Sequence, residues 1–220
     1  MSDLEPVYVF DKDGVLVESE PIKLALFEDM FEEEYAEHVP AIRRLNRSEI
    51  GMARKDKLVL VFRDIIGLIG DDLTDRVDAY LDRSYHFVKE ALLKAPALPG
   101  VIEFIRQSPN IKYVCSAALH AEVIDQLEAL DIQDAFEEAF AFPDKKADVL
   151  AKLKEAHAPQ PIVFWGDTRF DHQAATSAEV TFIGLEKASH ADFEGLDVHT
   201  IKDFCDHDGL KQWIAANAKA

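Results

Sequence analysis

Two carboxylates follow the first apolar run of the chain. Residues 7–10 are apolar and rich in β-forming side chains, which predicts a buried strand, and Asp11 and Asp13 come directly after it. Residues two apart in an extended segment lie on the same side, and two acids that close need a metal ion, a shared proton or unequal pKa values. The pair is therefore a candidate for a Mg²⁺-assisted carboxylate nucleophile with a second acid beside it. With Gly14, the same residues also fit a simple turn.

Further polar residues follow later apolar runs in the same way. Ser116 follows one such run, Lys145 or Lys146 comes after a second, and Asp167 and Asp171 follow a third. Because the carboxyl ends of parallel strands meet at one edge of a sheet, we expect these groups to converge with the first two acids. Carboxylates suit Mg²⁺, while a hydroxyl and an ammonium can hold phosphoryl oxygens. The ordered set predicts phosphoryl transfer, where positioning and charge neutralisation supply most of the catalysis.

The elements that position these residues alternate in type after residue 95. The predicted strands lie at 7–10, 111–115, 136–142, 162–165, 180–185 and 198–201, and the predicted helices between the later ones lie at 101–107, 120–130, 145–157, 171–178 and 208–218. Strands that alternate with helices indicate a parallel sheet.

The stretch from 21 to 93 has a different pattern, because it contains several helical periodicities, including one over 21–36, and no convincing strand. The Pro- and Gly-containing segment 94–100 returns the chain to the sheet. We therefore expect an α/β fold with a Rossmann-like, doubly wound parallel sheet as its core and an inserted all-helical cap domain. The expected boundaries are 1–17 and 96–220 for the catalytic core and 18–95 for the cap.

Basic residues gather within the predicted helical insert. The cluster comprises Arg43, Arg44, Arg47, Arg54, Lys55, Lys57 and Arg63. It could face an anionic substrate, with arginine binding phosphate through paired hydrogen bonds. The alternative is a set of surface ion pairs with the acid-rich first helix of the insert.

Composition excludes several classes of partner. The chain has 220 residues and is 48% hydrophobic, which is enough for one large domain or for a core with a smaller insert. A net charge of −18 argues against nucleic acid or an anionic membrane as a partner. No apolar run approaches membrane-spanning length, and the first residues lack the features of a signal peptide, so we expect a cytoplasmic protein.

Taken together, these motifs resemble the haloacid dehalogenase superfamily of aspartate-nucleophile phosphatases. Residues 11–16 look like its first motif, Ser116 its second, 146–150 its third and 166–171 its fourth. The helical insert resembles the cap of the phosphoglycolate phosphatase and β-phosphoglucomutase branch. In total the resemblance spans roughly residues 7 to 185.

The resemblance implies a role for each acid. Asp11 is the nucleophile that forms an aspartyl-phosphate. Asp13 protonates the leaving oxygen and then activates water. The implied metal is Mg²⁺, held by the Asp11 carboxylate, the backbone carbonyl of Asp13 and Asp167, and supported directly or through water by Asp171. For Asp171, a helix-starting acid is the alternative role.

The resemblance also implies how the substrate is held. Ser116 and Lys146 bind the transferring phosphoryl group, and Lys146 is preferred to Lys145 because of its distance to Leu150. Arg54, in a cap segment that the family uses for substrate phosphate, is the implied cap contact. The cap then closes over the site to exclude water.

The implied function is a Mg²⁺-dependent phosphatase for a small phosphorylated metabolite, such as a sugar phosphate or a phosphoglycolate-like compound. The first rival is a sugar-phosphate mutase, which Lys23 disfavours because mutase-like members carry a histidine there. A non-catalytic phospho-acceptor is a second rival, which the long insert after the first strand disfavours. Neither the particular substrate nor the oligomeric state follows from the sequence.

Overall fold

The computed structural model of the protein describes residues 4–187 and 193–218. The chain divides into two compact units. The core unit comprises Met1–Glu18 and Pro96–Ala220, and the helical unit comprises Ser19–Ala95. Their roles as catalytic core and cap stay predictions.

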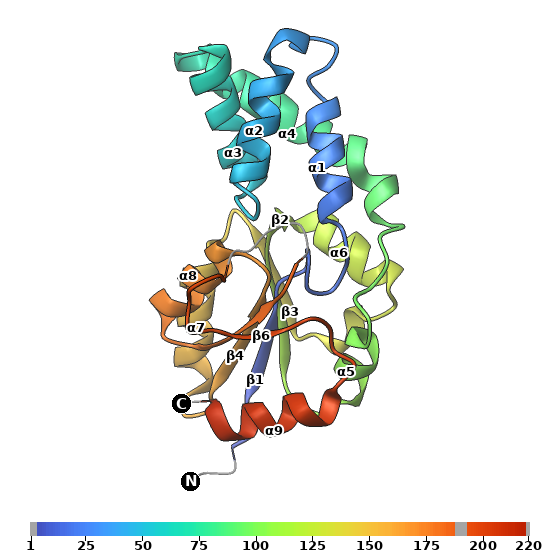
Figure 1. Ribbon diagram of the computed structural model, residues 1–220, viewed down its shortest axis with the longest axis vertical. Helices are drawn as coiled ribbons and strands as arrows, with labels where there is room; N and C mark the ends of the chain where they lie inside the picture. Colours follow the sequence, from blue (N-terminus) through green and yellow to red (C-terminus); the bar gives the residue numbers. More distant parts are fainter. Residues whose placement is uncertain (1–3, 188–192, 219–220) are drawn as a thin grey trace. The chain divides into compact units, whose positions relative to one another are not determined.

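A six-stranded parallel sheet forms the centre of the core unit (Figure 1). Its strands, in the spatial order β3-β2-β1-β4-β5-β6, are β3 (Glu138–Phe142), β2 (Lys112–Leu119), β1 (Val7–Phe10), β4 (Ile162–Gly166), β5 (Thr181–Leu185) and β6 (His199–Ile201). The chain adds β2 and β3 on one side of β1 and then returns to place β4 on the other side. The strand order therefore reverses between β1 and β4, and ligands of such sheets bind outside the carboxyl ends of the strands at this point.

Helices cover both faces of the sheet. Successive residues of β1 show this, because Tyr8 and Phe10 belong to one buried apolar cluster whereas Val7 and Val9 belong to the other. The first cluster includes side chains from α5 (Val101–Gln107), α6 (His120–Ala129) and α9 (His207–Asn217), and the second from α7 (Lys146–His157) and α8 (Arg169–Ala178). This arrangement confirms the predicted α/β fold with a doubly wound parallel sheet.

The described residues of the helical unit contain helices and turns and no strand. The elements are α1 (Glu20–Asp29), η1 (Ala36–His38), α2 (Val39–Ser48), α3 (Arg54–Leu60), η2 (Val61–Ile66) and α4 (Gly70–Leu92). Their apolar faces meet in a cluster that includes Phe31, Phe62 and Tyr80. The predicted all-helical insert is therefore confirmed. Across the described parts of the chain, no helix combines the length and the apolarity that a membrane span requires.

Two boundaries in the helical unit differ from the sequence-based prediction. The helix predicted over 21–36 ends at Asp29, before the run Glu32, Glu33 and Glu34, whose charges would oppose the negative end of the helix dipole. The sequence also predicts two helices over 41–69 broken near Asn46 and Gly51; the break lies at Gly51, between α2 and α3, whereas Asn46 lies inside α2. The buried Asn46 side chain donates to the Leu24 carbonyl at 3.1 Å, a contact between helices that local sequence pattern does not report.

A buried lysine shares the interior of the helical unit. The ammonium of Lys57 donates to Asn46 Oδ1 at 3.0 Å and lies 5.4 Å from the centre of the Phe27 ring. The pKa of Lys57 is lowered to about 8, mainly by burial; the positive charges of Lys23 and Arg54 act in the same direction, and Glu49 and Glu20 oppose them. Lys57 is therefore a buried cation with charges of both signs nearby.

Lys57→Met should stabilise the protein at neutral pH and remove a pH dependence. Between pH 8 and 10 the unfolded chain binds the Lys57 proton more tightly than the folded chain does, so the free energy of unfolding of the wild type rises with pH in this window. Keeping the Lys57 charge buried at pH 7 costs the wild type roughly 3 kcal/mol of stability. The variant regains only part of this, because Asn46 Oδ1 loses its hydrogen-bond donor. Urea unfolding at several pH values measures both effects. Lys55→Met, which replaces a more exposed lysine, is the control. If the free energy of unfolding of Lys57→Met rises with pH as much as that of the wild type, the lowered pKa is wrongly assigned to Lys57.

Candidate active site

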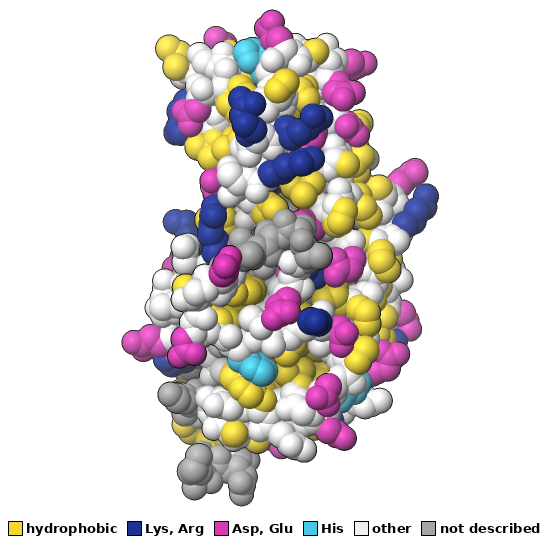
Figure 2. Space-filling view, in the orientation of Figure 1, with side chains coloured by type: hydrophobic (Ala, Val, Ile, Leu, Met, Phe, Trp, Pro, Cys, Tyr) yellow, Lys and Arg dark blue, Asp and Glu magenta, His cyan; other side chains and the backbone are white. Residues whose placement is uncertain are grey.

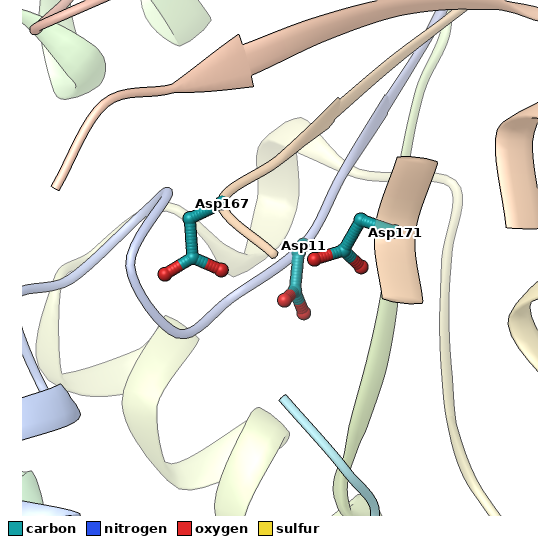
Figure 3. Close-up of side chains that lie close together, drawn as sticks. All are labelled: Asp11, Asp167 and Asp171. Atoms are coloured by element: carbon teal, nitrogen blue, oxygen red, sulfur yellow. The ribbon is translucent and has the colours of Figure 1, made fainter. Parts of the chain in front are cut away.

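Three buried aspartates meet at the switch point of the sheet (Figure 3). Asp11 follows β1, Asp167 follows β4, and Asp171 lies in the first turn of α8. Each contributes one carboxylate oxygen to a group in which all three oxygens lie within 4.8 Å of one another. The backbone N–H of Asp11 also donates to the Trp165 carbonyl at 2.9 Å, which ties the two strand ends together. The predicted convergence of these acids is therefore present.

Two glycines make this close approach possible. A Cβ on Gly14, which has a left-handed φ of 74°, would lie 1.7 Å from Asp167 Oδ2. A Cβ on Gly166 would lie 2.2 Å from the Cβ of Asp171. Any larger residue at either position would displace one of the three carboxylates, which we call the aspartate triad (Asp11, Asp167 and Asp171).

Asp171 holds the start of α8 as well as a place in the triad. Its Oδ2 accepts hydrogen bonds from the backbone N–H of Thr168 at 3.1 Å and from Thr168 Oγ1 at 2.7 Å, which forms a capping box. The helix-starting role considered for Asp171 is therefore present, and its role in supporting a metal stays a prediction. Thr168 was not singled out from the sequence, although Thr-x-x-Asp before a helix is a capping-box pattern that could have identified it.

Lys146 links two of the three acids. Its Nζ lies 2.9 Å from Asp11 Oδ2 and 2.5 Å from Asp171 Oδ1. Burial acts to lower the pKa of Lys146, but the carboxylates of Asp11 and Asp171 outweigh it and raise the pKa above its usual value. Lys146 therefore stays protonated. Lys145, the alternative that sequence pattern left open, is exposed.

Asp13 lies close to the triad but outside it. β1 ends at Phe10, and the backbone turns at Gly14. The charge of Asp13 helps to raise the pKa of Asp11, so the two carboxylates are near each other, and their shared side stays a prediction. The carboxylate of Asp13 pairs with Lys12, whose Nζ lies 2.5 Å from Asp13 Oδ1. Lys12 had no predicted role.

Ser116 lies within a strand that is longer than predicted. β2 continues to Leu119, and its register against β3 shifts between Cys115 and Leu119. Phe10 is paired with Val114, so Ser116, two residues further along β2, comes just beyond the end of β1 on the neighbouring strand. Ser116 is buried, and its Oγ accepts a hydrogen bond from the backbone N–H of Ala118 at 3.3 Å.

The basic cluster of the insert is largely neutralised within the helical unit. Figure 2 shows Lys and Arg side chains gathered on this unit, where α2 presents an arginine-rich face. The ion pairs are Arg43 and Arg47 with Glu28, Lys55 with Asp78, and Arg63 with Asp64. The predicted pairs with the first helix of the insert are therefore present for Arg43 and Arg47, whereas Lys55 and Arg63 pair with acids elsewhere in the helical unit.

Arg54 has a different environment from those four. It begins α3, and its Nη1 donates to Ser84 Oγ at 3.0 Å. It also contributes to the positive charge that lowers the pKa of the buried Lys57. A role for Arg54 at the substrate stays a prediction.

The triad carries more negative charge than the nearby lysines offset. Burial raises the pKa of Asp11 to about 6; Lys146 opposes this shift, and Asp171 and Asp13 add to it. Burial, together with the charges of Asp171 and Asp11, also raises the pKa of Asp167, against the charges of Lys187 and Lys146. Lys187, which pairs with Glu18 at 2.7 Å, had no signal in the sequence. Buried carboxylate oxygens with excess negative charge fit a hard divalent cation.

These features define an α/β protein with a buried acidic site, suited to a metal ion, at the switch point of a parallel sheet. The model of the haloacid dehalogenase-like hydrolase family matches residues 6–179. The protein therefore belongs to this family of hydrolases, as the motifs predicted. A search of curated proteins found no match.

Solved structures share the fold over nearly the whole chain. A hydrolase from Pseudomonas syringae is 21% identical, with a TM-score of 0.75, and the match covers 94% of this chain and 99% of that one. A predicted phosphoglycolate phosphatase from Haemophilus somnus is 20% identical, with a TM-score of 0.69 and coverage of 96% and 100%. A β-phosphoglucomutase from Clostridium difficile is 15% identical, with a TM-score of 0.70 and coverage of 95% and 98%. At these identities the likeness establishes the fold alone.

Mg²⁺ should stabilise the folded protein in a pH-dependent manner. A saturating concentration should raise the thermal midpoint at pH 7.5 by about 5 °C. The rise should shrink as the pH falls through about 6, because protonation of Asp11 competes with the metal. Differential scanning fluorimetry with Mg²⁺ or EDTA measures the shift. Asp167→Asn should remove most of it, whereas Asp197→Asn, an exposed acid of the same unit, should not; a shift that persists in Asp167→Asn would exclude the triad as the metal site.

Proposed function

We propose that this hydrolase is a Mg²⁺-dependent phosphatase that cleaves a small phosphorylated metabolite through an aspartyl-phosphate intermediate. The observation that carries the proposal is the contact of the Lys146 ammonium with Asp11 Oδ2, beside two further buried carboxylates. A carboxylate next to a permanent cation suits attack on an anionic phosphoryl group, because the cation offsets repulsion between nucleophile and substrate.

Asp11 and Asp13 carry the two chemical steps in this proposal. Asp11 attacks phosphorus, the bond from phosphorus to the leaving oxygen breaks, and Asp13 delivers a proton to that oxygen. Water then attacks the phosphorus of the acyl phosphate while Asp13 removes its proton, which releases inorganic phosphate and restores Asp11. A carboxylate at position 13 favours a phosphatase over a dehalogenase, since dehalogenating members of the superfamily lack an acid there.

Other residues of the core unit hold the phosphoryl group and the metal. Lys146 and Ser116 bind the phosphoryl oxygens. Mg²⁺, when bound by the Asp11 carboxylate, the backbone carbonyl of Asp13 and Asp167, supplies positive charge at the reacting phosphoryl group. Asp171 gives both of its oxygens to protein donors, Lys146 and Thr168, which favours a supporting role over direct coordination.

The helical unit contributes substrate recognition in this proposal. Arg54 is the substrate contact, because its guanidinium suits an anionic phosphate ligand. Lys23 argues against the mutase, because an ammonium that keeps its proton at neutral pH does not replace a titrating imidazole in proton transfer.

Asp11→Asn should abolish turnover while the protein stays folded. The test is phosphate release from a panel of sugar phosphates and phosphoglycolate, with Mg²⁺ and with EDTA. We expect wild-type activity that requires Mg²⁺ and a loss of at least about 1000-fold in the variant, because the amide is not a nucleophile. Circular dichroism confirms folding, and Asp197→Asn is the matched control. Phosphate release by Asp11→Asn would remove Asp11 as the nucleophile, and an isomerised sugar phosphate in place of free phosphate would favour the mutase.

Arg54→Ala should raise KM for the metabolite more than for 4-nitrophenyl phosphate, because the aryl ester lacks the groups that the helical unit would bind. A change of roughly 10-fold or more in the ratio of the two KM values corresponds to one lost charge-assisted hydrogen bond. Arg63→Ala, which removes an exposed arginine of the same unit, is the control. Equal effects of Arg54→Ala on both substrates would exclude Arg54 from substrate recognition.

A further inference from the structure

A fully buried lysine lies between the two acids that carry the proposed chemistry. The side chain of Lys12 is 0% exposed, and its ammonium lies 2.5 Å from Asp13 Oδ1, whereas the Asp13 side chain is 19% exposed. Within the described residues, Asp13 is the one hydrogen-bond acceptor of this ammonium. The backbone N–H of Lys12 also donates to Asp11 Oδ1 at 2.7 Å. Lys12 therefore contacts both acids, one through its backbone and the other through its side chain.

The backbone around Lys12 is fixed by its own loop. Its carbonyl accepts hydrogen bonds from the N–H groups of Leu16 at 2.9 Å and Val17 at 3.1 Å. The loop thus winds around Lys12, and the ammonium cannot reach solvent without disturbing it. A buried ammonium that loses its counter-ion is strongly destabilising, so the pair restricts where the Asp13 carboxylate can lie.

We propose that Lys12 is a positioning residue for Asp13. Its ammonium sets the orientation from which the Asp13 carboxylate reaches the leaving-group oxygen and then the attacking water. This inference rests on the proposed phosphatase function and adds a residue to it. In this scheme the Lys12 ammonium acts through Asp13 and does not contact the phosphoryl group or the leaving-group oxygen.

The choice of leaving group distinguishes a positioning role of Lys12 from a merely structural one. An alkoxide leaves poorly without a proton from Asp13, whereas a nitrophenolate leaves readily without one. Misplacing the Asp13 carboxylate should therefore slow an alkyl phosphate much more than an aryl phosphate. General loss of structure should slow both substrates alike.

The first experiment compares kcat on an alkyl phosphate from the active panel with kcat on 4-nitrophenyl phosphate. Lys12→Met should lower kcat for the alkyl ester by about 10- to 100-fold and for the aryl ester by less than about 3-fold. Lys12→Arg, which keeps the charge, should restore much of the difference. Lys112→Met is the matched control, because Lys112 is another buried lysine of the core unit and donates to the Ser108 and Asn110 carbonyls at 2.7 Å each. Its ratio of the two kcat values should equal that of the wild type.

The second experiment needs no activity. Urea unfolding of the wild type, Lys12→Met, Asp13→Asn and the double variant measures the coupling of the pair. Asp13→Asn should have a lower urea midpoint than the double variant, because it leaves the Lys12 ammonium buried without its counter-ion. Additive effects of the two substitutions would overturn the pair on which the proposal depends.

The remaining outcomes distinguish this inference from the proposed function. An active wild type with an unchanged substrate ratio in Lys12→Met, or equal losses on both substrates, would overturn the positioning role and leave the phosphatase intact. A wild type without any Mg²⁺-dependent phosphate release would overturn the phosphatase and the inference together. If Lys12→Met does not fold, Lys12→Arg, Asp13→Asn and the double variant still test the coupling of Lys12 with Asp13. A double variant that is no more stable than Asp13→Asn would overturn this coupling.

Discussion

The contacts of Lys146 hold together an arrangement that electrostatic repulsion opposes. Asp11, Asp167 and Asp171 are buried with their oxygens in one group, and like charges repel strongly where water is excluded. The ammonium of Lys146 lies against Asp11 and Asp171 and offsets part of this repulsion. The pKa values of Asp11 and Asp167 stay raised, first because both carboxyls are buried and then because neighbouring acids repel them. A divalent cation would supply the missing charge, so the same excess that destabilises the metal-free site favours metal binding.

The sheet supplies the geometry that this site requires. β1 and β4 are neighbours at the point where the strand order reverses, so Asp11 and Asp167 start from adjacent strand ends. Side chains of β1 are buried in apolar clusters on both faces, which fixes the backbone that carries Asp11. Glycines at 14 and 166 then allow the carboxylates to approach the backbone closely. The chemistry thus depends on rigid strand ends, while the loop around Lys12 carries the acid that would exchange protons.

Local pattern predicted the positions of the strand ends because it depends on near neighbours. Apolar runs followed at once by Asp11 or Asp167 needed no knowledge of the rest of the chain, and the family motifs selected Lys146. The same reasoning was wrong about the end of the helix over 21–36, and it placed a break near Asn46 as well as at Gly51, where the break lies. The first error overlooked the charge at a helix end, and the second overlooked contacts of Asn46 with another helix. It also did not identify Lys57 as buried, since a lysine that follows Lys55 and Asp56 is typical of an exposed surface.

By itself the sequence determined the fold class, the family and the residues that supply carboxylates, because each depends on residue type and on short spacing. Only the tertiary structure decided which of those groups touch. Residue type and spacing did not predict, for example, that the Asp13 carboxylate pairs with the buried ammonium of Lys12. The contacts of Lys146 with Asp11 and of Lys187 with Glu18 join residues more than 130 positions apart. Such contacts depend on how distant segments pack, and no local pattern encodes that distance.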